Sequence, residues 1–525
     1  MDPVWRDALA LDDLKSAGRK VVKLDGKQIA VFWRDGDVYA CNNRCPHEGF
    51  PLVEGTVTDT CTLTCNWHNW KFDLANGNNL RDGDKLRVYP TRIDGDRLLI
   101  DIADPPADRM IAAALANIVD ALPKHEYDRI GREVARLEKA GGDPLDAVRA
   151  SIADTADRME YGWTHAYAAT ADWLALRAKL DGSNAAALAP IMESIGHMAW
   201  DTMRERHFPF HDEATAYDED AFVDAIENED EAKAMALMNG ALRENLGYDA
   251  VRHGLIRAAL SHYQGFGHAM IYVCKAGELI ERLGPDAAPP LLRSLTRYLV
   301  YTTREDLIPE FRAYRPARDA WDGTGTQTVD AETLSTLPMA KAMEACLSAC
   351  ADPVRLYETL LDAVSLQFLR FDTNLDHQAD NPVSQNVTWL DFTHAITFAN
   401  AGRWAAETDP AFWPDVLLQM ACFLGRNAGF QDKDVSVSDW AVGDTAGFFD
   451  EALMAQLDHD HPEYIVSCHY VKLLTAARAE VAARPDADFV KTLGAAINRM
   501  IAHPIRRKHI LRTANQSLDF VAREG

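Results

Sequence analysis

The 525-residue chain has a shortage of basic residues and lacks any long uninterrupted apolar run. Acidic residues outnumber basic ones by 80 to 54, which gives a formal net charge of -26. This negative field repels phosphate backbones and anionic lipid, so it argues against nucleic acid and membrane surfaces as partners. Without an apolar stretch that could cross a bilayer, we also expect no membrane span.

The N-terminal stretch MDPVWRDALALDDLKSAGRK lacks the basic-then-apolar order of a secretory signal. The nine cysteines are an odd number and are scattered along the chain, which argues against a disulfide framework. We therefore expect a cytoplasmic protein whose cysteines are reduced thiols or metal ligands.

Two periodicities divide the chain. Residues 18–102 contain short segments rich in β-branched and aromatic residues, separated by Gly and Asp turns, which predicts a small antiparallel β domain. From residue 109 onward apolar residues recur at three- and four-residue spacing, which predicts more than ten helices. The stretch ADPPAD at residues 103–108 is typical of a linker.

We accordingly predict an α+β multidomain fold. A small all-β domain occupies residues 1–104, and a large all-α domain occupies residues 105–525. A turn-rich patch predicts that the second domain consists of two halves, dividing near residues 315–335.

Two cysteine–histidine pairs in the β region form a candidate metal site. Cys45 and His47 lie in CPHEGFPL, and Cys65 and His68 lie in CNWHNWKFD. Zinc would need all four around one ion, and its usual spacing of two to four residues does not suit the Cys45–His47 step. In a Rieske cluster two cysteines bind one iron and two histidines bind the other, which this spacing favours.

These two segments resemble the cluster-binding loops of Rieske [2Fe–2S] proteins. The resemblance implies that Cys45, His47, Cys65 and His68 hold a [2Fe–2S] cluster, with Gly49 allowing a close backbone turn. Neither loop has the extra cysteine of the high-potential respiratory type, so the segments are similar to the ferredoxin and oxygenase kind. Departures from the family pattern are Asn66, where proline is common, and Asn69, where glycine is usual.

Other residues near the motif have simpler interpretations. Trp67 and Trp70 are expected to cover the cluster, and Cys41 and Cys61 to be small buried residues. The stretch DGTGTQT at Asp322 lacks a third glycine and a preceding strand, so no nucleotide-binding signature accompanies the cluster. Electrons are therefore expected from an external reductase or ferredoxin.

One hypothesis for the helical region is a ring-hydroxylating oxygenase α subunit with iron held by two histidines and a carboxylate. His262 and His268 have nearly suitable spacing. The expected acidic residue is Ala259, however, and that family builds its catalytic domain around a large sheet, which the helical pattern here does not match.

A second pattern places a histidine near the start of four helical segments, each followed by a helix breaker and a second apolar helix. If these hairpins stack around an axis, the four imidazoles line one cavity that could bind a metal, a substrate or a reactive oxygen species. The alternative is that they are repeated packing residues or hydrogen-bond anchors. Asp391 lies three residues before the third of these histidines, His394, on the same helix face. The four are His165, His268, His394 and His469.

The stretches DFTHAITFANA and GHAMIYVCKAGELI resemble segments of the questin oxidase-like family, which is helical and is associated with Baeyer–Villiger-type ring cleavage of aromatic polyketides. The resemblance implies a catalytic role for His268, Asp391 and His394. The repeated pattern adds His165 and His469 as residues that line the cavity.

We therefore expect a Rieske oxidoreductase that passes single electrons to the helical domain for a monooxygenase-like oxidation of a small organic substrate, with additional iron in that domain. The alternative is a non-catalytic electron-transfer protein whose helical domain docks a redox partner.

Overall fold

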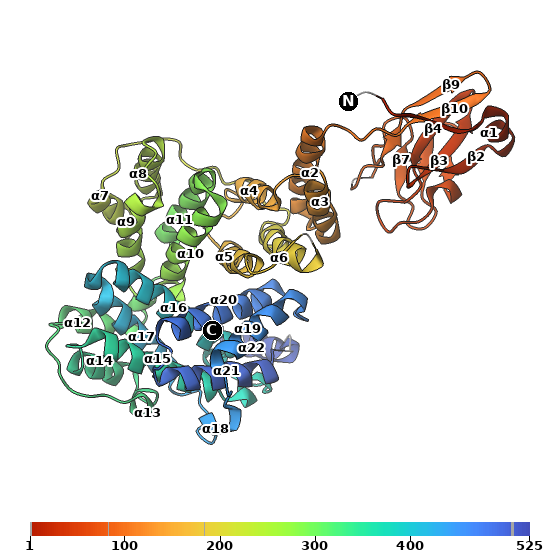
Figure 1. Ribbon diagram of the computed structural model, residues 1–525. Coiled ribbons are helices and arrows are strands. Elements are labelled where there is room, and N and C mark those ends of the chain that lie inside the picture. The colour runs from red at the N-terminus through yellow and green to blue at the C-terminus, as the bar shows by residue number, and fades with distance from the viewer. Residues whose placement is uncertain (1–2, 82, 183, 506–508, 525) are drawn as a thin grey trace. The chain divides into compact units, whose positions relative to one another are not determined.

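A computed structural model describes residues 3–81, 83–182, 184–505 and 509–524. Its contacts divide the chain into an N-terminal unit, Met1–Ala147, and a helical unit, Val148–Gly525 (Figure 1). The predicted order of a small all-β region followed by a large helical region is confirmed. Two helices that follow the β region group with it, and the predicted domain boundary near residue 104 stays a prediction.

The β region consists of three small antiparallel sheets, in the strand orders β1-β10-β9, β2-β3-β4-β8 and β5-β6-β7. Two-residue Asp-Gly turns with positive φ at both positions join β2 to β3 and β3 to β4, as the right-handed twist of a hairpin requires. The elements are β1 (Trp5–Ala10), α1 (Leu11–Ala17), β2 (Arg19–Leu24), β3 (Lys27–Arg34), β4 (Asp37–Asn42), β5 (Thr56–Val57), β6 (Thr62–Thr64), β7 (Lys71–Asp73), β8 (Val88–Tyr89), β9 (Thr91–Asp94) and β10 (Arg97–Asp101).

The first strand was outside the segment predicted to be β. β1 begins at Trp5 and pairs with β10, although the pattern predicted strands only from residue 18. Most of its side chains are at least partly exposed, so it lacks the apolar alternation that marks a half-buried strand.

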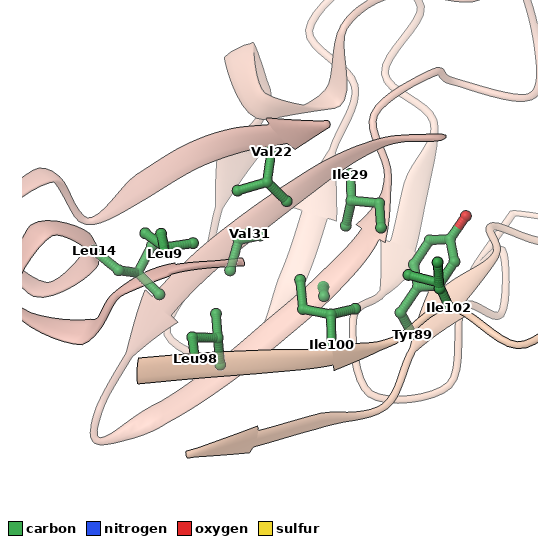
Figure 2. Packing of buried hydrophobic residues seen from close by; sticks show 10 residues of the cluster. Leu9, Leu14, Val22, Ile29, Val31, Tyr89, Leu98, Ile100 and Ile102 are labelled. Carbon is green, nitrogen blue, oxygen red and sulfur yellow. The ribbon is translucent and has the colours of Figure 1, made fainter. Parts of the chain in front are cut away.

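Strand β3 carries side chains into two cores because it is buried on both faces. Ile29 and Val31 face the core drawn in Figure 2, together with Leu98 and Ile100 of β10. Their neighbours on the opposite face pack in a second core that includes Cys45 and Cys65. Because side chains alternate along a strand, β3 packs against the cluster loops with one face and against the first core with the other.

Two helices complete the N-terminal unit, α2 (Ala107–Ala121) and α3 (Tyr127–Lys139). They pack against each other, and the buried Arg129 of α3 donates hydrogen bonds to Asp120 at 2.8 Å and Glu126 at 2.7 Å. The unit boundary lies within the next helix, α4 (Pro144–Thr155).

In the described part of the helical unit there is no β-strand, which agrees with the predicted all-α character. No helix among the described residues is both long enough and apolar enough to cross a membrane. The helices are α5 (His165–Arg177), α6 (Ala185–Asp201), α7 (Glu219–Glu227), α8 (Glu231–Arg243), α9 (Tyr248–Leu260), α10 (His268–Leu283), α11 (Ala288–Tyr301), α12 (Tyr314–Asp319), α13 (Ala331–Leu334), α14 (Met339–Ser348), α15 (Pro353–Leu369), α16 (Trp389–Thr408), α17 (Trp413–Asn427), α18 (Val437–Trp440), α19 (Thr445–Ala455), α20 (Tyr464–Ala483), α21 (Phe489–Ala502) and α22 (Ile510–Ala522).

Four of these helices form a closed ring. α5 packs on α10, α10 on α16, α16 on α20, and α20 on α5 (Figure 1). Each is followed by a break and a second helix, as the repeated pattern predicts: α6, α11, α17 and α21. The division of the helical region near residues 315–335 stays a prediction, and the structure has an irregular segment between α12 and α13.

Candidate metal centres

The four predicted cluster ligands lie on two turns with the same backbone hydrogen bonds. In each turn the cysteine N–H donates to the carbonyl five residues later, and the cysteine carbonyl accepts from the N–H four residues later. These bonds fix the two cysteines in equivalent positions, where the Cys45 thiol lies against that of Cys65. The partners are Phe50 and Gly49 for Cys45, and Trp70 and Asn69 for Cys65.

Both turns need a residue with a left-handed backbone. Gly49 has φ of 79° and Asn69 has φ of 61° at the equivalent position. Asparagine tolerates this conformation better than other residues with a side chain, so Asn69 can serve where glycine is usual.

The cysteines are buried and the histidines reach the surface. Cys45 and Cys65 are 4% and 1% exposed, whereas the His47 and His68 side chains are 31% and 38% exposed, with their Nδ1 atoms 3.1 Å apart. Burial raises the pKa of the Cys45 thiol to about 11, so a thiolate here needs a cation beside it. Two buried thiols and two exposed imidazoles fit a cluster with one cysteine-bound and one histidine-bound iron.

One of the two tryptophans covers a ligand. Trp70 stacks on His47, with ring centroids 4.6 Å apart and an interplanar angle of 15°. Trp67 is 63% exposed and contacts Phe50 and His68 with ring centroids 5.7 Å away. Trp70 therefore covers the ligand His47, whereas Trp67 is an exposed aromatic side chain beside the two histidines.

The remaining cysteines near the cluster lie where small residues were expected. Cys41 is fully buried in the second core, and Cys61 is packed at its edge. The Cys61 thiol also donates a hydrogen bond of 3.3 Å to the hydroxyl of Tyr39.

A β fold with two cysteine–histidine turns defines an iron–sulfur electron carrier. Residues 4–90 match the model of the Rieske [2Fe-2S] domain. The chain belongs to the Rieske family through this N-terminal region, and the predicted [2Fe–2S] cofactor is confirmed.

Three similar proteins each match about a fifth of the chain, in its N-terminal region. The ferredoxin component of the naphthalene 1,2-dioxygenase/salicylate 5-hydroxylase systems of Ralstonia sp is 30% identical over 18% of this chain and 93% of that protein. The biphenyl dioxygenase ferredoxin subunit of Pseudomonas sp. (strain KKS102) is 30% identical over 18% of this chain and 90% of its own length. Among solved structures, the ferredoxin of carbazole 1,9a-dioxygenase from Nocardioides aromaticivorans IC177 is 27% identical over 19% of this chain and 98% of that chain, with a TM-score of 0.18.

The second centre lies inside the ring of four helices, where the four repeated histidines converge. The Nε2 atom of His268 is 3.0 Å from Nε2 of His165 and 3.0 Å from Nε2 of His394. Nε2 of His394 is in turn 3.1 Å from Nε2 of His469. Four ring nitrogens from four separate helices therefore point at one spot.

The opposite ring nitrogens determine the tautomer of three imidazoles. Nδ1 of His268 lies 2.5 Å from the carbonyl of Gly265, and the Nδ1 atoms of His394 and His469 lie 2.6 and 2.5 Å from carbonyls one helical turn earlier. A carbonyl only accepts, so each Nδ1 carries the proton and each Nε2 presents a lone pair. Facing lone pairs repel unless a cation lies between them, and the donor set thus fits a metal ion.

The surroundings keep these histidines neutral. Burial, and then the charge of Lys472, lower the pKa of His268 to about 3. Burial likewise holds the pKa values of His165, His394 and His469 well below the usual range. A neutral imidazole is the form that binds metal, so the site is prepared for a cation.

A cavity of about 380 Å³ reaches the four-histidine site at His165. Trp200 and Tyr464 line it, and His197 stacks on Tyr464 with ring centroids 5.1 Å apart. Asp201 also lines it, and burial raises the pKa of its carboxyl to about 6. An aromatic cavity with a carboxyl group thus opens beside one of the candidate ligands.

Asp391 and His262 lie apart from this cluster. The Asp391 carboxylate accepts a hydrogen bond of 2.7 Å from the Thr388 N–H at the start of α16 and one of 3.0 Å from Arg426. Its predicted catalytic role stays a prediction. His262 belongs to a separate, partly buried ion cluster with Glu227, Asp306 and Arg304.

Two ionisable neighbours of the four histidines were absent from the predicted site. Lys472 is buried, and its spacing of one helical turn from His469 was the signal that could have identified it. Asp201 joins the cavity through the end of α6, far from any motif in the chain, and no local pattern marks it.

Proposed function

We propose that this protein oxidises a small organic substrate at a metal ion held by the four converging histidines, using electrons from the N-terminal Rieske cluster. The observation that carries the proposal is the meeting of four neutral imidazoles around one point in a chain that also has an electron-transfer domain. The ferredoxin relatives support the electron-transfer half.

Iron is the metal that suits both the four imidazole ligands and the one-electron carrier in the same chain. Imidazole ligands accept zinc, copper, nickel or iron, so the donor set alone does not select among them. A one-electron carrier in the same chain favours a metal that changes oxidation state, which zinc does not. Bound iron would supply the chemistry of oxygen activation, and the external donor would be a reductase or ferredoxin.

The chain's own residues provide orientation of the imidazoles, aromatic surface for a substrate and a proton-holding carboxyl group. Backbone carbonyls fix His268, His394 and His469 through their Nδ1 atoms. Trp200 and Tyr464 offer aromatic surface to a substrate in the cavity that reaches His165. The Asp201 carboxyl, whose Oδ2 accepts a hydrogen bond of 2.5 Å from the Thr164 hydroxyl, is able to exchange a proton near pH 6 because burial raises its pKa to about 6.

The overall reaction balances as a monooxygenation. One oxygen atom of O₂ enters the substrate and the other leaves as water, with two electrons and two protons consumed. A Rieske cluster carries one electron at a time, so the external donor reduces it twice in each cycle.

Metal analysis of His268→Ala with His394→Ala tests the proposal. We expect the double variant to lose the iron that exceeds the cluster's two atoms, and with it the substrate-dependent consumption of electrons. The matched control is His207→Gln, which changes an exposed histidine of the same unit that pairs with Asp157. This control should retain the additional iron and the substrate-dependent consumption of electrons. If the double variant keeps all iron and all activity, the alternative of an electron-transfer protein with a docking domain stands instead.

A further inference from the structure

Helix α3 makes a buried ionic contact with the loop that lies behind the cluster. Arg132 donates hydrogen bonds of 3.0 Å and 2.6 Å to Asp84 Oδ2, and Arg136 donates one of 2.8 Å to Asp84 Oδ1. The Asp84 side chain is 0% exposed, and Arg136 also pairs with the buried Glu133. Burial alone would raise the pKa of Asp84, but its bonds to the two arginines lower it, so the carboxylate is charged and held.

The residue before Asp84 backs the tryptophan that covers His47. Gly83 has φ of 107°, and a Cβ atom there would lie 2.8 Å from Cη2 of Trp70. Gly83 therefore lies close against the six-membered ring of Trp70 and leaves no room for a side chain there. The same Trp70 ring system stacks on His47.

We propose that α3 is a positioning element for the iron–sulfur cluster. Arg132 and Arg136 fix Asp84, the adjoining Gly83 backs Trp70, and Trp70 is thereby held over the exposed ligand His47. The inference concerns the N-terminal unit alone and holds whether or not the helical unit is catalytic.

The consequence is a controlled reduction potential. Reduction adds one negative charge to the cluster, and water stabilises that charge better than an aromatic ring does. A loosened Trp70 admits water at His47, so the potential should rise. Loss of two arginine charges acting purely through the electrostatic field would lower the potential, because nearby cations favour the reduced form. The two explanations therefore predict opposite signs.

Redox titration of the full-length protein carrying Arg132→Gln and Arg136→Gln tests this. We expect the reduced-to-oxidised ratio at the wild-type midpoint to rise about three- to tenfold, where tenfold corresponds to about 59 mV for one electron. The spectrum of the reduced cluster in electron paramagnetic resonance should change as well. The control is Arg97→Gln, which removes an exposed ion pair with Asp7 and should change neither.

A second variant keeps the test decisive if the arginine variant fails to hold its cluster. Gly83→Ala leaves all four ionic groups in place and forces the Trp70 ring away, so it should also raise the potential. An unchanged potential in Gly83→Ala overturns the proposal, as does an unchanged or lowered potential in a loaded arginine variant. A rise in both establishes α3 as a positioning element.

Discussion

At the scale of single residues, three of the four histidines are constrained at both ends of the imidazole ring. In His268, His394 and His469 the Nδ1 proton is donated to a backbone carbonyl, so rotation or tautomer change would break a buried hydrogen bond. The cost of an unsatisfied buried donor is about 1–3 kcal/mol. The lone pairs at Nε2 are thus aimed by the helices themselves, before any cation enters.

His262 should make the stability of the helical unit depend on pH. Burial alone would lower its pKa, but hydrogen bonds to Asp306 and Glu227 raise it, and the pKa of Asp306 falls to about 2. The histidine contribution is complete below its unfolded pKa of about 6.5 and is lost as pH rises through the raised value. The aspartate contribution is present above about 3.9 and is lost as pH falls through 2.

The expected result is a melting temperature that declines above neutral pH in the wild type and declines less in His262→Gln. The variant should cost about 1–3 kcal/mol near pH 6, since it removes the charged partner of a partly buried cluster in which Asp306 still pairs with Arg304. Thermal melts from pH 5 to 9 measure both effects, with His207→Gln as the exposed control. Parallel curves for wild type and His262→Gln would contradict the assignment.

Asn69 should tolerate glycine but not a β-branched residue. Its φ of 61° lies in the left-handed region, which costs about 1–2 kcal/mol for ordinary side chains. We expect Asn69→Gly to retain the cluster at least as well as wild type and Asn69→Val to lose it faster. The decay of visible absorbance in the presence of an iron chelator measures this, and equal rates for the two variants would refute it.

The cluster ligands could be predicted because all four lie within two short loops, whose spacing already distinguishes an iron–sulfur cluster from zinc. The ion pairs of Asp84 with Arg132 and Arg136 could not be predicted from the sequence. Arg132 is 48 residues from Asp84 in sequence, and a chain with 80 acidic and 54 basic residues allows many such pairs. The pair with Asp84 is distinguished from an exposed pair by its buried carboxylate, and burial is a property of the packed fold.

At the scale of secondary-structure elements, the repeated hairpin explains why four histidines meet. His165 and His268 open their helices, while His394 and His469 lie in the second turn of theirs. Since the four helices pack in a ring, residues near equivalent ends face a common axis. Repetition was visible in the sequence, whereas closure of the ring depends on contacts between helices far apart in the chain.

Substitutions at the start of α16 test whether Asp391 caps the helix or takes part in the reaction. Thr388 and Asp391 form a capping box, and Asp391 also pairs with Arg426. Thr388→Ala should cost about 1 kcal/mol, and Asp391→Ala somewhat more because it also loses the ion pair. We expect the two variants to lose metal and activity in proportion to their loss of stability. Full stability and metal content in Asp391→Ala, combined with lost turnover, would show a direct role in the reaction.

At the scale of the whole molecule, the iron–sulfur cluster and the proposed four-histidine metal site should load independently. They share no ligand, and their ligands lie in different compact units. His68→Ala should lose the sulfide and iron of the cluster and keep the metal of the helical unit. His394→Ala should do the reverse and should still accept one electron from a chemical reductant. Both should lose substrate oxidation, since each removes one end of the electron path.

Iron and acid-labile sulfide per chain, measured on each single variant and on the pair combined, give the result. Independent sites predict that the combined variant loses as many iron and sulfide atoms per chain as the two single variants lose together. The exposed His207→Gln again serves as the control for a generic histidine substitution. Loss of sulfide in His394→Ala would show instead that the cluster depends on the helical unit to assemble, because no residue near the cluster has been changed.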